Sequence, residues 1–131
     1  MLATLDVSID PEASRFAVDS AVEAGAALLV VNAVETAFRP VTLVGWDYVA
    51  REDVEESLRQ PCALASSLGV AVERLRVRSP RPVDALLEVV AEREPGLLVF
   101  GPDPALLSKR AYRRAERTVR ERSPCLVWTA G

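Results

Sequence analysis

Apolar residues along this chain occur in two recurring patterns, short continuous runs and longer segments with helical periodicity. Residues 26–34 and 97–100 are apolar at nearly every position, which is typical of strands buried on both faces. In residues 13–24, by contrast, apolar side chains recur at helical spacing on one side, and polar side chains form a stripe on the other. This alternation predicts a parallel sheet with helices on both of its faces.

The same patterns predict five strands and four helices in one α/β domain that spans residues 1–131. We expect a doubly wound, Rossmann-like fold with a five-stranded, mostly parallel sheet. Strands are predicted at about 2–5, 26–34, 70–77, 97–100 and 125–129, and helices at about 11–24, 51–68, 80–94 and 105–122. The strand at 70–77 alternates apolar and charged residues, so we place it near a sheet edge.

Proline and glycine mark most of the expected helix boundaries. Asp10-Pro11 and Asp103-Pro104 each combine an N-cap residue with proline at the first helical position. Pro61 should kink or restart the second helix because proline lacks the donor N–H. Residues 35–50 are predicted to be a connection without firm secondary structure, in which Trp46 and Tyr48 either line a pocket or pack as an ordinary loop.

The composition argues against several kinds of catalytic and metal-binding site. The chain has no histidine, the commonest general base near neutral pH and the commonest zinc ligand. Cys62 and Cys125 have neither metal-ligand nor redox spacing and are expected to be reduced thiols. No nucleophile elbow or acid–base pair is evident, so an enzyme is not expected. Without an apolar run long enough for a membrane span or the order of a signal peptide, the predicted location is the cytoplasm.

Charge is distributed unevenly along the chain. Residues 1–58 hold eleven acidic and three basic residues, whereas residues 96–131 hold three acidic and seven basic residues. The basic residues fall on the predicted helix 105–122, which is either an ordinary solvated face or a surface for nucleic acid or an acidic partner. Nucleic acid is disfavoured because no exposed aromatic residues accompany the patch and the sequence pI is about 5.1.

Three short segments carry a family resemblance. Asp6-Val7-Ser8 follows the first strand, Gly96-Leu97-Leu98-Val99-Phe100-Gly101 contains the fourth, and Pro124-Cys125-Leu126-Val127-Trp128 contains the last. In order and spacing they resemble the universal stress protein family over nearly the whole chain. The resemblance implies an adenosine contact at Asp6, but the favoured interpretation is that this side chain satisfies backbone donors in a turn. It also implies a homodimer formed through the C-terminal strand, where Trp128 lies at an expected sheet edge.

The family's ATP-binding signature, Gly-x2-Gly-x9-Gly-Ser, falls on Gly101, Pro104, Arg114 and Ala115, so only its first position is kept. Proline has no N–H, and arginine blocks the close backbone approach that phosphates need. Asp103 adds a negative charge where the phosphates would lie. We therefore expect that the phosphate loop has been absorbed into helix and that ATP is not bound tightly.

The leading hypothesis is a non-enzymatic, universal-stress-type protein that binds a protein partner or a small ligand and needs no cofactor. One alternative is an ATP-binding switch or slow ATPase that uses Asp6, Gly101 and the start of the fourth helix. Another is a module that binds nucleic acid or an acidic partner through the basic helix. A cation site at Asp6, Asp10 and Glu12 is disfavoured, because Asp10 already serves as a cap and Glu12 as a first-turn acid.

Overall fold

Strands and helices alternate in the computed structural model, which describes residues 1–36 and 44–130. The elements are β1 Leu2–Thr4, α1 Pro11–Ala24, β2 Leu28–Glu35, α2 Val44–Ser67, β3 Val72–Ser79, α3 Pro82–Arg93, β4 Leu97–Phe100, the 3-10 helix η2 Pro104–Leu106, α4 Lys109–Arg122 and β5 Leu126–Thr129. The predicted five strands and four α-helices are thus confirmed within these residues.

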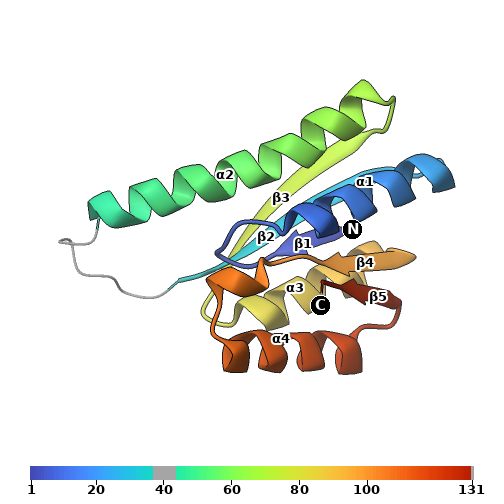
Figure 1. Ribbon diagram of the computed structural model, residues 1–131. Coiled ribbons are helices and arrows are strands. Elements are labelled where there is room, and N and C mark those ends of the chain that lie inside the picture. The colour runs from blue at the N-terminus through green and yellow to red at the C-terminus, as the bar shows by residue number, and fades with distance from the viewer. Residues whose placement is uncertain (37–43, 131) are drawn as a thin grey trace.

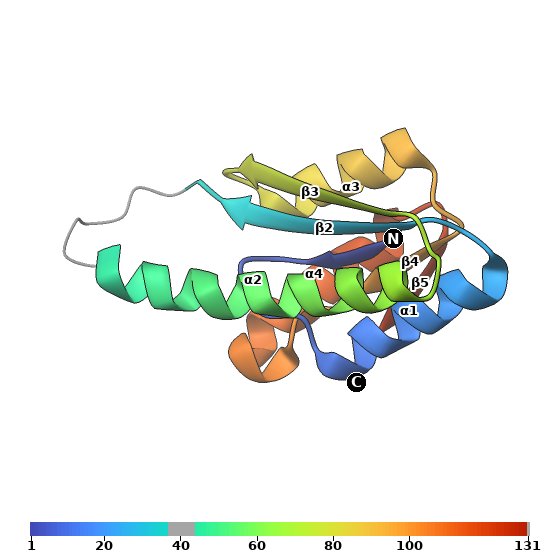
Figure 2. The same cartoon turned by 90° about the horizontal axis from the view of Figure 1, so that it is seen from above.

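The sheet has the strand order β3-β2-β1-β4-β5, and every neighbouring pair is parallel. Helices α1 and α2 cover one face, and α3 and α4 cover the other (Figures 1 and 2). The predicted doubly wound architecture is therefore confirmed, with a sheet that is entirely rather than mostly parallel. β3 and β5 are its two edges, as expected for β3 from its alternating pattern.

Local sequence explains the position of α1. The Asp10 carboxylate caps the helix by accepting hydrogen bonds from the backbone N–H groups of Glu12 and Ala13, both at 3.1 Å. Gly25 ends the helix with a φ of 63°, a left-handed conformation that glycine adopts without steric cost. Both boundaries agree with the sequence prediction.

Helix α2 differs from its prediction at two points. It begins at Val44, not near Arg51, so much of the expected irregular connection is helical. It also continues through Pro61 without a restart. Pro61 is buried, and Leu58 and Ala65 on either side of it pack against the same core, so tertiary packing outweighs the missing hydrogen bond. The side chains of Trp46 and Tyr48 lie outside the described part of the structure.

Two later helix starts also differ from expectation. α3 begins at Pro82 rather than at Ser79-Pro80, because Ser79 still belongs to β3 and pairs with Glu35. The segment after β4 forms two helices, η2 and α4, where one was predicted.

Among the described residues, no helix combines the length and apolarity that a membrane crossing requires.

Candidate functional site

Asp6 and Gly101 lie at the same end of the sheet, just beyond the carboxyl ends of the inner strands β1 and β4. Asp6 follows β1 in an exposed bend, and Gly101 follows β4 and is buried. β1 and β4 are neighbours, but the chain leaves β1 toward the α1 layer and leaves β4 toward the α4 layer (Figure 1). Such a switch point is where parallel α/β sheets usually bind ligands. The structure thus brings the two predicted site residues to the carboxyl ends of two neighbouring strands.

Direct backbone pairing joins the loop after β1 to the loop after β4. Ile9 and Pro102 form an isolated antiparallel bridge. The backbone N–H of Asp10 donates to the carbonyl of Gly101 at 2.8 Å, and that of Asp103 donates to the carbonyl of Ser8 at 2.9 Å. We call this pairing of residues 8–10 with 101–103 the loop clamp. It holds the β1–α1 loop against the β4–η2 loop.

Gly101 has a packing role within the loop clamp. A Cβ atom at this position would lie 2.9 Å from the Ala13 Cβ and 3.2 Å from the Leu2 Cδ1. The Gly101 N–H also donates to the carbonyl of Ala3 at 2.8 Å, which extends the pairing of β4 with β1. The missing side chain therefore lets α1 approach β4 closely.

No free backbone donor remains between residues 101 and 106. Pro102 and Pro104 have no N–H, the Gly101 N–H donates to the Ala3 carbonyl, and the Asp103 N–H donates within the loop clamp. Ala105 donates to the Asp103 carboxylate at 2.9 Å, and Leu106 donates to the Asp103 carbonyl at 3.0 Å. Phosphate recognition by a loop requires backbone N–H groups that point at the ligand. This segment has none to offer without breaking a bond it already makes.

Helix α2 supports the same loop from the side. The Ser57 Oγ accepts from the Ile9 N–H at 3.1 Å and lies 2.7 Å from the Val54 carbonyl, to which it donates. Thr4 is fully buried and donates its hydroxyl to the Val7 carbonyl at 2.8 Å. The turn after β1 is therefore fixed from both ends.

The remaining signature positions lie on α4. Arg114 is exposed, and Ala115 is buried against the sheet. The prediction that residues 104–114 are helical is confirmed except at Leu107 and Ser108, where the chain is extended. Ser108 accounts for the break, because its side chain accepts from the Ala111 N–H at 3.1 Å and so starts a new helix.

Tyr112 is an inward-facing residue that the sequence reading missed. The neighbouring Ala111 is exposed, and Tyr112 is buried. Its hydroxyl donates to the Ala130 carbonyl at 2.8 Å, and its ring lies 6.4 Å from that of Phe100. Burial, followed by the nearby Glu116 and Asp10 carboxylates, raises the pKa of Tyr112. The spacing of Tyr112, Ala115 and Val119 is the signal that identifies this face.

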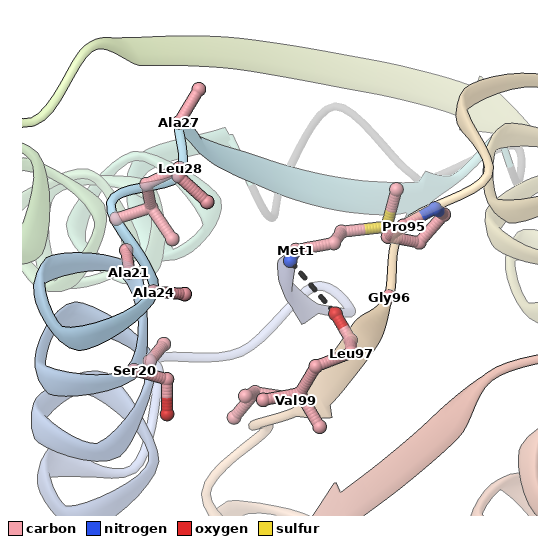
Figure 3. Close-up of a pocket in the computed structure, with 12 residues that line it drawn as sticks. Met1, Ser20, Ala21, Ala24, Ala27, Leu28, Pro95, Gly96, Leu97 and Val99 are labelled. Atoms are coloured by element: carbon pink, nitrogen blue, oxygen red, sulfur yellow. Dashed lines mark hydrogen bonds between the residues drawn. The ribbon is translucent and has the colours of Figure 1, made fainter.

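A cavity of about 420 Å³ lies at the opposite end of the sheet, by the amino ends of β1 and β4. Small apolar residues of α1 and the segment before β2 line much of it, as Figure 3 shows. At its rim the Met1 amino group donates to the Leu97 carbonyl at 2.9 Å, and burial lowers the pKa of this amine. No pattern in the sequence predicted this cavity.

No cluster of three or more potential metal ligands occurs in residues 1–36 and 44–130. The Asp10 carboxylate accepts hydrogen bonds from the first turn of α1, as described above. Asp6 is exposed, and its side chain is not free of partners.

A family model described as the universal stress protein family matches residues 1–129. This chain belongs to the universal stress protein family. No curated protein shows a significant match. The family assignment agrees with the fold and with the resemblance seen in the sequence.

Solved universal stress proteins share the fold over nearly the whole chain. One in complex with cAMP is 24% identical, with a TM-score of 0.66 and coverage of 100% of this chain and 97% of that one. A family protein from Burkholderia pseudomallei is 23% identical, with a TM-score of 0.62 and coverage of 98% and 94%. One from Arabidopsis thaliana with AMP bound is 12% identical, with a TM-score of 0.57 and coverage of 98% and 90%.

Proposed function

We propose that this chain is a non-enzymatic universal stress protein that acts in stress response or regulation by binding a protein partner or a small ligand, and that it does not bind ATP tightly. One observation carries the proposal. From residue 101 to residue 106, each backbone N–H either already donates a hydrogen bond within the protein or is missing because the residue is proline. A triphosphate at this loop would have to replace bonds that also hold the loop clamp together.

Charge supports the same conclusion. The carboxylates of Asp10 and Asp103 both lie at the carboxyl ends of β1 and β4, where each accepts hydrogen bonds from backbone donors. Phosphate oxygens would compete with these carboxylates for the same donors and would be repelled by them. A neutral or weakly charged ligand meets neither obstacle.

The alternative is an adenine-nucleotide-binding switch of the same family. Two of the solved relatives contain cAMP or AMP, which carry fewer phosphates than ATP. The start of α4 favours this alternative, because Lys109 and Arg110 stand there with the positive end of the helix dipole. A monophosphate placed there would not need the donors of residues 101–106.

Calorimetric titration of nucleotide-stripped protein with ATP and magnesium, and separately with AMP and cAMP, tests both readings. We expect no saturable heat with ATP at millimolar concentration. Saturable micromolar binding of ATP would overturn the proposal. Saturable binding of AMP or cAMP alone would establish the alternative and identify a monophosphate site.

We also propose that the chain is a cytoplasmic homodimer joined through its C-terminal strand. β5 is a sheet edge, and its Leu126 is 76% exposed. Trp128 of the same strand stacks on Phe16, with ring centroids 4.7 Å apart, so a partner strand would meet an ordered apolar surface. Light scattering should give a dimer mass that Leu126→Glu reduces to a monomer. Leu64→Glu on α2, also at an exposed leucine, is the control that should remain dimeric.

A further inference from the structure

We infer that the outward surface of α4 docks a short acidic segment of a partner protein, an inference that rests on the proposed partner-binding function. The surface, here called the α4 basic face, carries five exposed cationic side chains over its first nine residues, with an exposed leucine just before them. Its members are Leu106, Lys109, Arg110, Arg113, Arg114 and Arg117.

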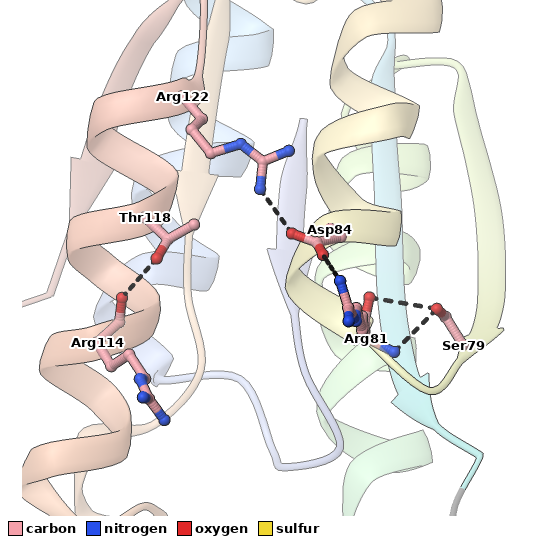
Figure 4. A network of polar contacts seen from close by, with 6 residues as sticks. All are labelled: Ser79, Arg81, Asp84, Arg114, Thr118 and Arg122. Carbon is pink, nitrogen blue, oxygen red and sulfur yellow. Dashed lines mark hydrogen bonds and ion pairs between the residues drawn. The ribbon is translucent and has the colours of Figure 1, made fainter.

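The arginines of α4 fall into two groups. Arg120 pairs with Glu116 at 3.1 Å and donates to the Thr129 hydroxyl at 2.7 Å, and Arg122 pairs with Asp84 of α3 at 2.6 Å (Figure 4). Among the described residues, no acidic side chain lies within ion-pair distance of a cation of the α4 basic face. Arg114 shows the difference in Figure 4, where its backbone carbonyl accepts from the Thr118 hydroxyl and its guanidinium group contacts none of the residues drawn.

Helix stability does not account for this placement. The first turn of α4 contains no acidic residue, and Lys109 and Arg110 stand where the helix dipole is positive. Like charges also recur at Arg110, Arg113, Arg114 and Arg117, three and four residues apart, which disfavours the helix further. Arg120 and Arg122, by contrast, occupy the last turn, where the dipole favours cations. The unpaired cations are therefore available for an external anion.

The spacing of these cations suits a polypeptide. Charges three or four residues apart along a helix recur at intervals of about 5 Å. Carboxylates at the same spacing on an acidic helix would face them in register, and guanidinium groups bind carboxylates through two parallel hydrogen bonds. Leu106, which is 55% exposed, offers an apolar contact at the end of the row. The structure thus suits an acidic segment that carries an apolar residue near one end.

The surroundings of the α4 basic face limit the length of the anion. α3 packs beside α4 and exposes Glu88 and Glu92, and Glu121 is exposed near the far end of α4. A long nucleic acid would run from the cations onto these carboxylates. Tyr112, the aromatic residue of α4, is buried and cannot stack on a base. A short acidic peptide fits within the basic area.

Fluorescence anisotropy with a synthetic peptide tests the inference. The probe is a labelled, helix-forming peptide with glutamate at every third or fourth position and a leucine near one end. A second peptide, with glutamine in place of each glutamate, is its control. We expect saturable binding of the glutamate peptide that weakens as salt rises, and no binding of the glutamine peptide.

Matched protein variants locate the surface. Arg113→Gln/Arg117→Gln should weaken peptide binding by about tenfold. Arg76→Gln/Arg78→Gln changes two exposed arginines of β3 by the same net charge and should leave binding unchanged. Thermal melting of both variants shows whether they remain folded, which the exposure of all four positions leads us to expect.

Three results would overturn the inference. They are the absence of peptide binding at low salt, equal weakening in both double variants, and tighter binding of single-stranded oligothymidylate than of peptide at the same ionic strength. The last would assign the face to nucleic acid. Tight ATP binding beside intact peptide binding would refute the proposed function alone, whereas loss of peptide binding without ATP binding would refute this inference alone.

Discussion

The neighbouring strands β1 and β4 are packed differently at their two ends, here called the carboxyl edge and the amino edge. At the carboxyl edge, the loop clamp joins residues 8–10 to residues 101–103 through backbone hydrogen bonds. At the amino edge, small side chains leave a cavity of about 420 Å³. The edge where parallel sheets usually bind ligands is thus the tightly bonded one, and space alone does not identify a binding site.

The largest effect is expected from Gly101→Ala at the carboxyl edge. The new methyl would lie 2.9 Å from the Ala13 Cβ, so α1 and β4 must separate. We expect a loss of about 2 kcal/mol in unfolding free energy, measured by urea denaturation. Gly96→Ala at the amino edge is the control, because a Cβ there meets no atom within 4 Å. Equal losses at both positions would show that the close approach at Gly101 is unimportant.

Tyr112→Phe should have the next largest effect. It removes the hydroxyl that bonds the Ala130 carbonyl and leaves that buried acceptor without its donor. The expected loss is about 1.5 kcal/mol. Thr118→Val on the outer side of α4 removes an exposed hydroxyl bond and should cost less.

Tyr112 should also make stability depend on pH in the alkaline range. Burial raises its pKa, so the folded state holds the phenolic proton more firmly than the unfolded chain does. Its contribution is complete below the ordinary tyrosine pKa of about 10 and is lost as the pH rises through the raised value. Urea denaturation across this range should show the decline in wild type and a smaller decline in Tyr112→Phe. The same decline in both would exclude Tyr112 as its source.

Asp10→Ala tests the cap that starts α1 at the carboxyl edge. The change removes two side-chain hydrogen bonds to the first turn and should cost about 1 kcal/mol. Asp10→Asn keeps an oxygen acceptor and should restore most of the loss. If both variants were equally destabilised, the charge rather than the cap would be the source.

The smallest effect is expected at the amino edge, from Ala24→Leu. Ala24 is exposed on α1 and lines the cavity, so a larger side chain has room there. We expect a change within about 0.5 kcal/mol in thermal or urea unfolding. A loss as large as that of Gly101→Ala would show that the amino edge is packed as tightly as the loop clamp.

Local signals predicted the parts of the fold that depend on neighbouring residues. The cap at Asp10, the left-handed Gly25 and the buried runs of β2 and β4 all followed from short segments of sequence. Helix continuity through Pro61 did not, because it depends on the core that the flanking turns of α2 contact. The break at Ser108 was missed because Asp103-Pro104 gave an equally good cap signal upstream.

For the candidate site, sequence placed Asp6 and Gly101 at one edge but could not show how the loops meet there. The bridge between Ile9 and Pro102 joins residues that are far apart in the chain, and no local pattern encodes it. The pairing of Arg122 with Asp84 likewise depends on how α3 packs beside α4, whereas Arg113 and Arg117 have no acidic partner within ion-pair distance among the described residues.

The central position of β1 has a consequence for how the protein is made. β1 is synthesised before β4, yet β4 is one of its two neighbours, and the Met1 amine donates to the carbonyl of Leu97, 96 residues later. Contacts of such high sequence separation form slowly, and domains generally fold as units during synthesis. The sheet therefore cannot be completed until β4 has been synthesised, and until then β1 has a strand to pair with on one side only.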